Sequence, residues 1–183
     1  MGHGANEASS RGTPWPRMIV EMVAVKQRLS EADTESLWDH RLPRVGASEH
    51  DLVAVERELG ESLDHEYREF LRHAAGWPAF YQSVDLFGPD DLLGGPLASR
   101  AAMILGAMDD VPFIEARITR QECLPIAVSA RDIDVFVIGR TSSSIPGTVI
   151  WLAGGEIDRF VGFGEFFASM IECDRREIDL MRE

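Results

Sequence analysis

The chain has 183 residues, of which 45% are hydrophobic, and this is enough for one domain with its own core. Asp and Glu number 31 against 18 Lys and Arg, so the formal net charge is -13. An acidic surface repels phosphate groups and therefore disfavours direct binding to nucleic acid or to an anionic membrane. It suits a basic protein partner, because opposite charges steer association, although solubility alone also explains it.

No apolar run approaches the roughly 20 residues that cross a bilayer, and the N-terminus carries no apolar signal segment. We therefore expect a cytoplasmic protein. The two cysteines, Cys123 and Cys173, show neither CxxC nor metal-ligand spacing, which favours reduced thiols over a disulfide or a metal site.

The N-terminal third divides into a tail and a helix. Residues 1–16 are rich in Gly, Ser, Ala and Pro, and we predict a disordered tail there. Four apolar residues then recur at helical spacing: Met18, Met22, Val25 and Leu29. They predict a helix that ends near Ala32. We assign residues 17–44 to an N-terminal helical extension and linker, and residues 45–183 to the main domain.

Between Ser48 and Trp77 the sequence predicts two short amphipathic helices. Ser48 and Asp51 have the spacing of a capping box at the start of the first helix. Gly60 provides a left-handed stop, and Asp64 caps the second helix, which ends by Gly76.

The second half of the domain is rich in strands. We expect a strand over 79–87, a turn over 88–91 and a helix over 97–108; segment 112–120 fits either helix or strand. Two hairpins follow, formed by 123–129 with 133–138 and by 148–152 with 156–161, and then a helix over 164–181. The prediction is an α+β fold, with N-terminal helices packed with a C-terminal helix on one mainly antiparallel sheet.

The sequence contains no pattern typical of an enzyme. HExxH, GxSxG and phosphate-binding loop motifs are absent, so we predict no catalytic residue, no cofactor and no metal site. Acidic pairs such as Asp90–Asp91 recur in predicted loops. A solvated rim and a patch for a basic partner explain these pairs equally well, whereas a catalytic carboxylate dyad needs convergence in a cleft that nothing indicates.

The helix pair and the later strands resemble the SUKH superfamily, which includes the fungal Smi/Knr cell-wall-synthesis regulators and bacterial immunity proteins. The resemblance covers residues from about 45 to 175. It is carried by Leu52, Val55, Glu56, Leu59, Gly60, Leu63, Tyr67, Phe70, Leu71 and Gly76, by the strands 124–127, 136–138 and 148–151, and by the helix start 163–167. Asp64 stands where the family usually has proline, and Ala75 replaces its common asparagine.

The resemblance implies a protein-binding module rather than an enzyme. Bacterial members neutralise a cognate toxin, often a nuclease or deaminase of a polymorphic toxin system, and the fungal members suggest a regulatory or scaffold role as the alternative. We expect a basic toxin as partner. The residues expected to contact it follow directly on the helix pair: Trp77, Tyr81, Asp85, Asp90 and Asp91. Trp77 also fits a core position.

Overall fold

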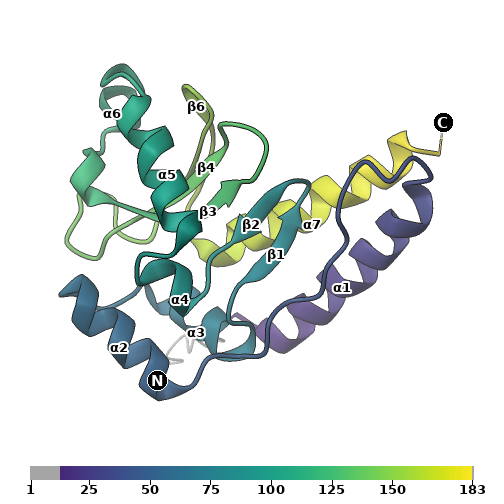
Figure 1. Cartoon of the computed structure of the whole chain (residues 1–183), viewed down its shortest axis with the longest axis horizontal. Coiled ribbons are helices and arrows are strands. Elements are labelled where there is room, and N and C mark those ends of the chain that lie inside the picture. Colours follow the sequence, from purple (N-terminus) through teal and green to yellow (C-terminus); the bar gives the residue numbers. More distant parts are fainter. Residues whose placement is uncertain (1–12, 183) are drawn as a thin grey trace, which may run out of the picture.

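The computed structural model describes residues 13–182 and is an α+β domain (Figure 1). Its helices are α1 (Trp15–Ala32), α2 (Glu49–Leu59), α3 (His65–His73), α4 (Pro89–Leu92), α5 (Pro96–Ala107), α6 (Val111–Ala116) and α7 (Phe163–Leu180), with a 3-10 turn at Arg120–Glu122. Its strands are β1 (Trp77–Tyr81), β2 (Val84–Leu86), β3 (Cys123–Ser129), β4 (Val135–Gly139), β5 (Val149–Leu152) and β6 (Glu156–Phe160).

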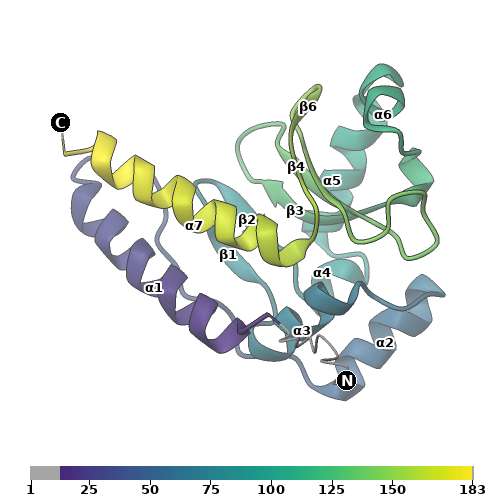
Figure 2. The same cartoon turned by 180° about the vertical axis from the view of Figure 1, so that it is seen from behind.

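Over this described part of the chain, the strands form one antiparallel sheet in the order β1-β2-β3-β4-β5-β6. Each strand pairs with the next along the chain, so the sheet is a continuous meander. Helix α7 crosses behind the strands in Figure 1, with α1 beside it, and Figure 2 shows the same pair from behind. These observations confirm the predicted fold class. Helix α5 covers β3 on the opposite face of the sheet.

The layers meet in a cluster of buried aromatic side chains. The ring centroid of Trp15 lies 5.5 Å from the centroids of Phe70, Phe163 and Phe167, which come from α3 and α7. Phe80 of β1 contacts Phe167 at 5.2 Å and so joins the sheet to the same cluster. Burial of such large rings supplies much of the hydrophobic stabilisation of a small domain.

The burial of Trp15 corrects the prediction for the end of the N-terminal tail. Helix α1 begins at Trp15, which is only 2% exposed, so the chain is already part of the core two residues before the predicted helix start. Residues 1–12, the rest of the segment 1–16 predicted as a disordered tail, lie outside the described residues.

The helix pair has the predicted caps. The Ser48 hydroxyl accepts a hydrogen bond from the Asp51 amide, and the Asp51 carboxylate accepts one from the Ser48 amide. Gly60 is left-handed with φ 71°, and Asp64 accepts from the Tyr67 amide at 3.0 Å. Caps of this kind satisfy amide groups that have no partner within the helix.

The predicted strand over 79–87 is instead the hairpin of β1 and β2. The chain reverses at Gln82, which adopts a left-handed conformation with φ 48°. Asn or Gly usually marks such a turn, and neither is present. Residues 89–92 form the short helix α4 rather than a turn, and α6 begins at Val111 in the segment that fitted either structure.

The segment between α3 and β1 passes very close to the backbone at the end of β2. Gly76 has φ 90°, and a Cβ built on it would lie 2.6 Å from the Gly88 nitrogen and 2.8 Å from the Leu86 oxygen. The Tyr67 hydroxyl donates to the Phe87 carbonyl at 2.9 Å beside this close contact. Only glycine satisfies both the backbone angle and the contact distance.

Gly76→Ala should therefore destabilise the fold by at least about 3 kcal/mol, because left-handed strain and a backbone clash add. Gly60→Ala is the matched control, since Gly60 is also left-handed but a Cβ added to it would meet no atom within 4 Å. That change should cost about 1 kcal/mol in denaturant unfolding. Equal losses of unfolding free energy for the two variants would show that the close backbone contact at Gly76 does not matter for stability.

Two buried charged side chains, Lys26 and Asp174, lie among α1, β1 and α7 without forming an ion pair. Lys26 is the only lysine in the sequence, is 4% exposed and donates to the Phe80 carbonyl at 3.0 Å. Asp174 is 1% exposed, and neither carboxylate oxygen has a hydrogen-bond partner among the described residues. Burial raises the pKa of Asp174 to about 6, opposed by the charge of Lys26 and assisted by Glu177. The ionised carboxylate is thus destabilising at neutral pH.

Asp174→Asn should raise the free energy of unfolding by about 1 to 3 kcal/mol at pH 7.5. Because the folded pKa exceeds the unfolded value, the penalty is absent below about pH 4 and complete above about pH 6. The variant should therefore match wild type at pH 4 and exceed it increasingly up to pH 6.5. Chemical denaturation across this range tests it, with the exposed Asp179→Asn on the same helix as control. A stability difference independent of pH would refute this interpretation of Asp174.

Candidate functional site

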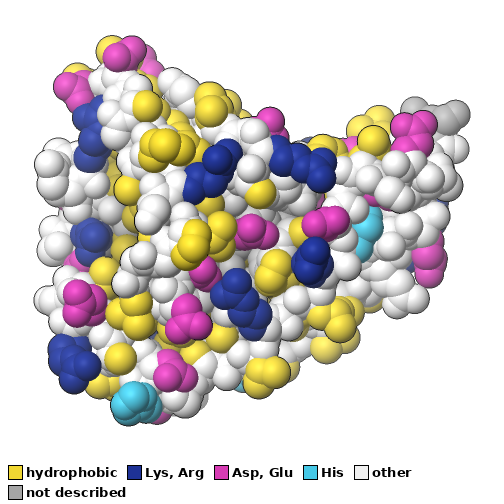
Figure 3. Space-filling view, in the orientation of Figure 1, with side chains coloured by type: hydrophobic (Ala, Val, Ile, Leu, Met, Phe, Trp, Pro, Cys, Tyr) yellow, Lys and Arg dark blue, Asp and Glu magenta, His cyan; other side chains and the backbone are white. Residues whose placement is uncertain are grey.

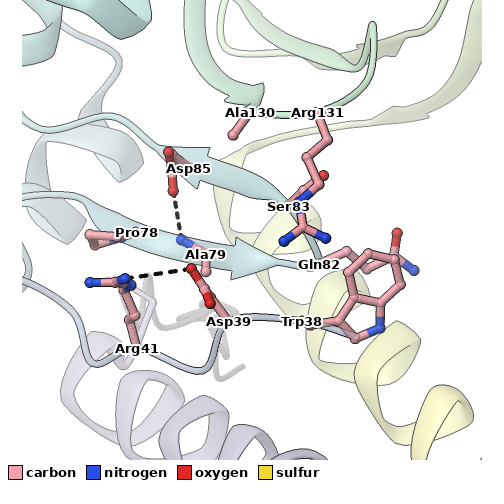
Figure 4. A pocket seen from close by; sticks show the side chains of 10 residues that line it. All are labelled: Trp38, Asp39, Arg41, Pro78, Ala79, Gln82, Ser83, Asp85, Ala130 and Arg131. Atoms are coloured by element: carbon pink, nitrogen blue, oxygen red, sulfur yellow. Dashed lines mark hydrogen bonds and ion pairs between the residues drawn. The ribbon is translucent and has the colours of Figure 1, made fainter. Parts of the chain in front are cut away.

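The outer face of the β1–β2 hairpin carries a cavity of about 230 Å³, which we call the hairpin pocket (Figure 4). Three segments that are distant in sequence form its walls: the hairpin itself, the linker after α1 and the turn after β3. The lining residues are Trp38, Asp39, Arg41, Pro78, Ala79, Gln82, Ser83, Asp85, Ala130 and Arg131.

The hairpin wall is held in a strained backbone conformation. Ala79 has φ 49°, an unusual angle for a residue with a Cβ, and the pairing of β1 with β2 shifts register between Trp77 and Tyr81. The Asp85 carboxylate accepts a hydrogen bond from the Ala79 amide at 2.7 Å, as Figure 4 shows. This bond satisfies an amide that the irregular strand leaves free.

The linker wall is fixed by Asp33 at the end of α1. Its carboxylate accepts from the Leu37 amide at 2.8 Å, from the Trp38 amide at 3.0 Å and from the His40 ring at 3.2 Å. Burial acts to raise the pKa of Asp33, but these hydrogen bonds outweigh it and hold the pKa below its usual value. The ionised carboxylate therefore fixes the linker where it lines the pocket.

The charges in the hairpin pocket are balanced. Arg131 extends from the turn after β3 toward the linker and donates to the Leu37 carbonyl at 3.3 Å (Figure 4). Arg41 and Asp39 form an exposed ion pair at 3.5 Å, a kind that contributes little to stability. The pocket is thus polar but not strongly acidic.

Two of the expected contact residues, Trp77 and Tyr81, face away from this pocket. Trp77 is fully buried, and its ring nitrogen donates to the Arg41 carbonyl at 2.8 Å, so it takes the core position that the sequence left open. A docking partner cannot reach its ring. Tyr81 is half-buried and packs edge-on against Trp151 at 5.9 Å. Burial raises the pKa of Tyr81 to about 12, with Cys173 and Asp174 nearby.

The three expected acidic residues lie in different environments. Asp85 is half-buried on the pocket wall, and Asp90 is exposed on α4. Asp91 is buried and accepts from the Gly88 amide and from Arg44, each at 2.9 Å. The structure therefore does not unite the five expected residues in one patch. Asp85 and Asp90 are the acids among them that a partner can approach.

Helix α4, which carries Asp90, packs against α2, which carries further exposed acidic side chains. The exposed residues Asp51 and Glu58 of α2, like Asp90, have no arginine or lysine within 4.0 Å in the described part of the chain. We call Asp51, Glu58 and Asp90 the α2–α4 acidic surface. In Figure 3, acidic side chains at the lower left, over α2 and α4, alternate with a few basic ones.

Sequence patterns did not indicate Trp38, Arg41 and Arg131 as parts of one site. Residues 33–44 show no hydrophobic period, and Arg131 belongs to a turn 90 residues further on. No local sequence pattern predicts that these two segments meet in the folded protein. Asp33 offers the one clue, because an aspartate directly after a helix, followed by polar residues, is typical of a side chain that organises a turn.

Among the described residues, no group of three or more His, Cys, Asp or Glu side chains is placed to hold a metal ion. Cys123 is buried, and burial raises the pKa of its thiol to about 12. A thiol with this pKa is a poor nucleophile at neutral pH. Across residues 13–182, no helix has the length and apolar character needed to cross a membrane.

The SMI1 / KNR4 family (SUKH-1) matches residues 46–169, and the chain is a member of that family. Its members act as immunity or regulatory domains that bind partner proteins and are not enzymes. Comparison with curated proteins gives no match.

The neighbours Asp90 and Asp91 should respond differently to loss of charge. Asp91→Asn removes the charge that pairs with Arg44 and holds the Gly88 amide, and should cost about 1 to 3 kcal/mol of stability. Asp90→Asn should change stability by less than about 0.5 kcal/mol. Thermal unfolding of the two variants checks this, and a destabilised Asp90→Asn variant would show that the exposed position is misassigned.

Proposed function

We propose that this protein is an immunity-type protein that binds and neutralises a cognate toxin domain, a nuclease or deaminase, through its acidic surface. The observation that carries the proposal is family membership combined with the net charge of -13. Immunity proteins form one of the two functional groups that the family supports, and the charge favours the group whose partners are basic.

The distribution of charge supports a contact through the helix pair. Between Glu49 and Arg72 the sequence has eight acidic residues and three arginines. Arg68 and Arg72 are engaged within this segment, with Glu49 in both cases, so they pair internally and do not offset the exposed acids of α2. A nuclease or nucleic-acid deaminase needs a positive surface to bind phosphate groups, and an acidic surface competes for it directly.

Electrostatic attraction also suits the rapid capture of a toxin. A toxin must be captured before it acts, and complementary charge raises association rates well above those of neutral partners. The hairpin pocket adds polar groups for a partner, since Arg131 donates to the Leu37 carbonyl and Asp85 accepts from the Ala79 amide on its walls. Long-range charge would bring the partner in, and the pocket would set its orientation.

The second candidate is a regulatory or scaffold module of the Smi1/Knr4 type, which the family name itself favours. Such a protein would bind an intracellular partner without neutralising a toxin. The two candidates differ in what lies beside the gene: a toxin-bearing reading frame favours immunity, and its absence favours regulation.

Co-expression with the toxin encoded beside the gene tests the proposal. Wild type should rescue growth and co-purify with the toxin. The pair Glu58→Lys and Asp90→Lys should lower the association rate about ten-fold at low ionic strength, because repulsion replaces attraction at the α2–α4 acidic surface.

The control pair is Glu35→Lys and Asp179→Lys, which changes the net charge equally at exposed positions distant from α2. It should reduce the rate less than about two-fold. Equal effects of the two pairs would contradict the acidic-surface assignment. Failure of wild type in both rescue and co-purification would reject the immunity function.

A further inference from the structure

A second concave surface lies between α5 and the turns of the later hairpins, away from the hairpin pocket. This α5 groove has a volume of about 490 Å³ and is lined by Met103, Ile104, Ala107, Met108, Asp109, Ile133 and Gly154. Apart from Asp109 and the glycine, every lining side chain is apolar. Figure 3 shows hydrophobic side chains gathered on the surface where Figure 1 draws α5.

The apolar side chains of the groove are exposed although the groove itself is held in place. Met103 is 64% exposed and Ile133 is 56% exposed. Arg100 of α5 donates to the carbonyls of Ser129 and Asp132, at 2.5 and 2.9 Å, and thereby fixes the turn that carries Ile133. Exposed apolar side chains on a fixed support are typical of binding sites, and methionines adapt readily to a partner's shape.

The charge at the groove indicates what binds there. Asp109 is its only charged lining residue, and it is exposed with no basic side chain within 4.0 Å among residues 13–182. The nearby arginines are already engaged, Arg100 with two carbonyls and Arg120 with Asp110 and the Met108 carbonyl. A lysine or arginine on a partner would therefore find Asp109 free.

We propose that the α5 groove binds an apolar side chain of a partner protein that has lysine or arginine as its neighbours. This proposal rests on the proposed function for the identity of the partner. It adds the feature of a basic toxin that the groove recognises. A second copy of the chain fits poorly, because two proteins of net charge -13 repel each other. Residues 1–12 fit poorly too, since Met1 is their only large apolar residue.

The test uses the full chain with isotope-labelled methionine and isoleucine methyl groups and three synthetic peptides on one scaffold. The first peptide has a central leucine flanked by lysines, the second the same leucine flanked by glutamates, and the third a central alanine flanked by lysines. The first should shift the methyl signals of Met103, Met108 and Ile133 in a saturable way. The second should bind about five-fold more weakly and the third about ten-fold more weakly.

Matched variants locate the contact. Ile133→Ser should weaken binding of the first peptide about ten-fold, whereas Ile157→Ser should leave it unchanged. Ile157 is equally exposed, at 54%, but lies outside the groove on β6. Asp109→Asn should remove the preference for lysine over glutamate flanks, and Asp179→Asn should retain it.

The proposal is overturned if no peptide binds, if all three bind equally, or if the shifted signals lie outside the groove. Methyl signals that change with protein concentration alone would mean that a second copy occupies the groove, which also overturns it. Because the peptides require no toxin, the result is separate from the rescue experiment. Peptide binding without toxin rescue would count against the proposed function alone.

Discussion

The aromatic cluster at the start of α7 holds the layers of this domain together. Phe163 and Phe167 contact Trp15 of α1 and Phe70 of α3, while Phe166 contacts Phe80 and Phe136 of the sheet. One helical turn thus touches every layer on that side of the sheet. Because Trp15 belongs to this cluster, helix α1 is part of the core, although it lies outside the segment 46–169 that the family shares. The position of the linker, and with it the hairpin pocket, follows from where α1 ends.

Local signals explain which elements could be predicted from the sequence. Ser48, Asp51 and Gly60 act within one or two turns of helix, and the hairpins of β3 with β4 and of β5 with β6 have strong strands around short turns. The hairpin of β1 with β2 was missed because its turn uses Gln82 in a left-handed conformation. Trp15 was missed because its burial depends on α3 and α7, and its Pro- and Gly-rich surroundings resemble a tail.

The candidate site was less predictable than the fold, because its residues meet only in three dimensions. Asp90 and Asp91 are equivalent in the sequence, yet one is exposed and the other is buried against Arg44. Trp38, Arg41 and Arg131 come from segments without a periodic pattern, and Asp33 and Arg100 set their positions through backbone carbonyls and amides. The family could be identified because its motif consists of framework residues with local signals, whereas the pocket residues come from segments far apart in the sequence.

The charge of the protein connects the fold to the function we propose. Within the helix pair, Arg68 and Arg72 pair with acids on their own segment. The acids that remain exposed give the surface a long-range field without weakening the core. The most direct test is the association rate of the wild-type protein with the purified toxin domain across ionic strengths. We expect a fast association rate at low salt that falls steeply as salt rises, since screening shortens the reach of the field. A rate independent of salt would contradict it.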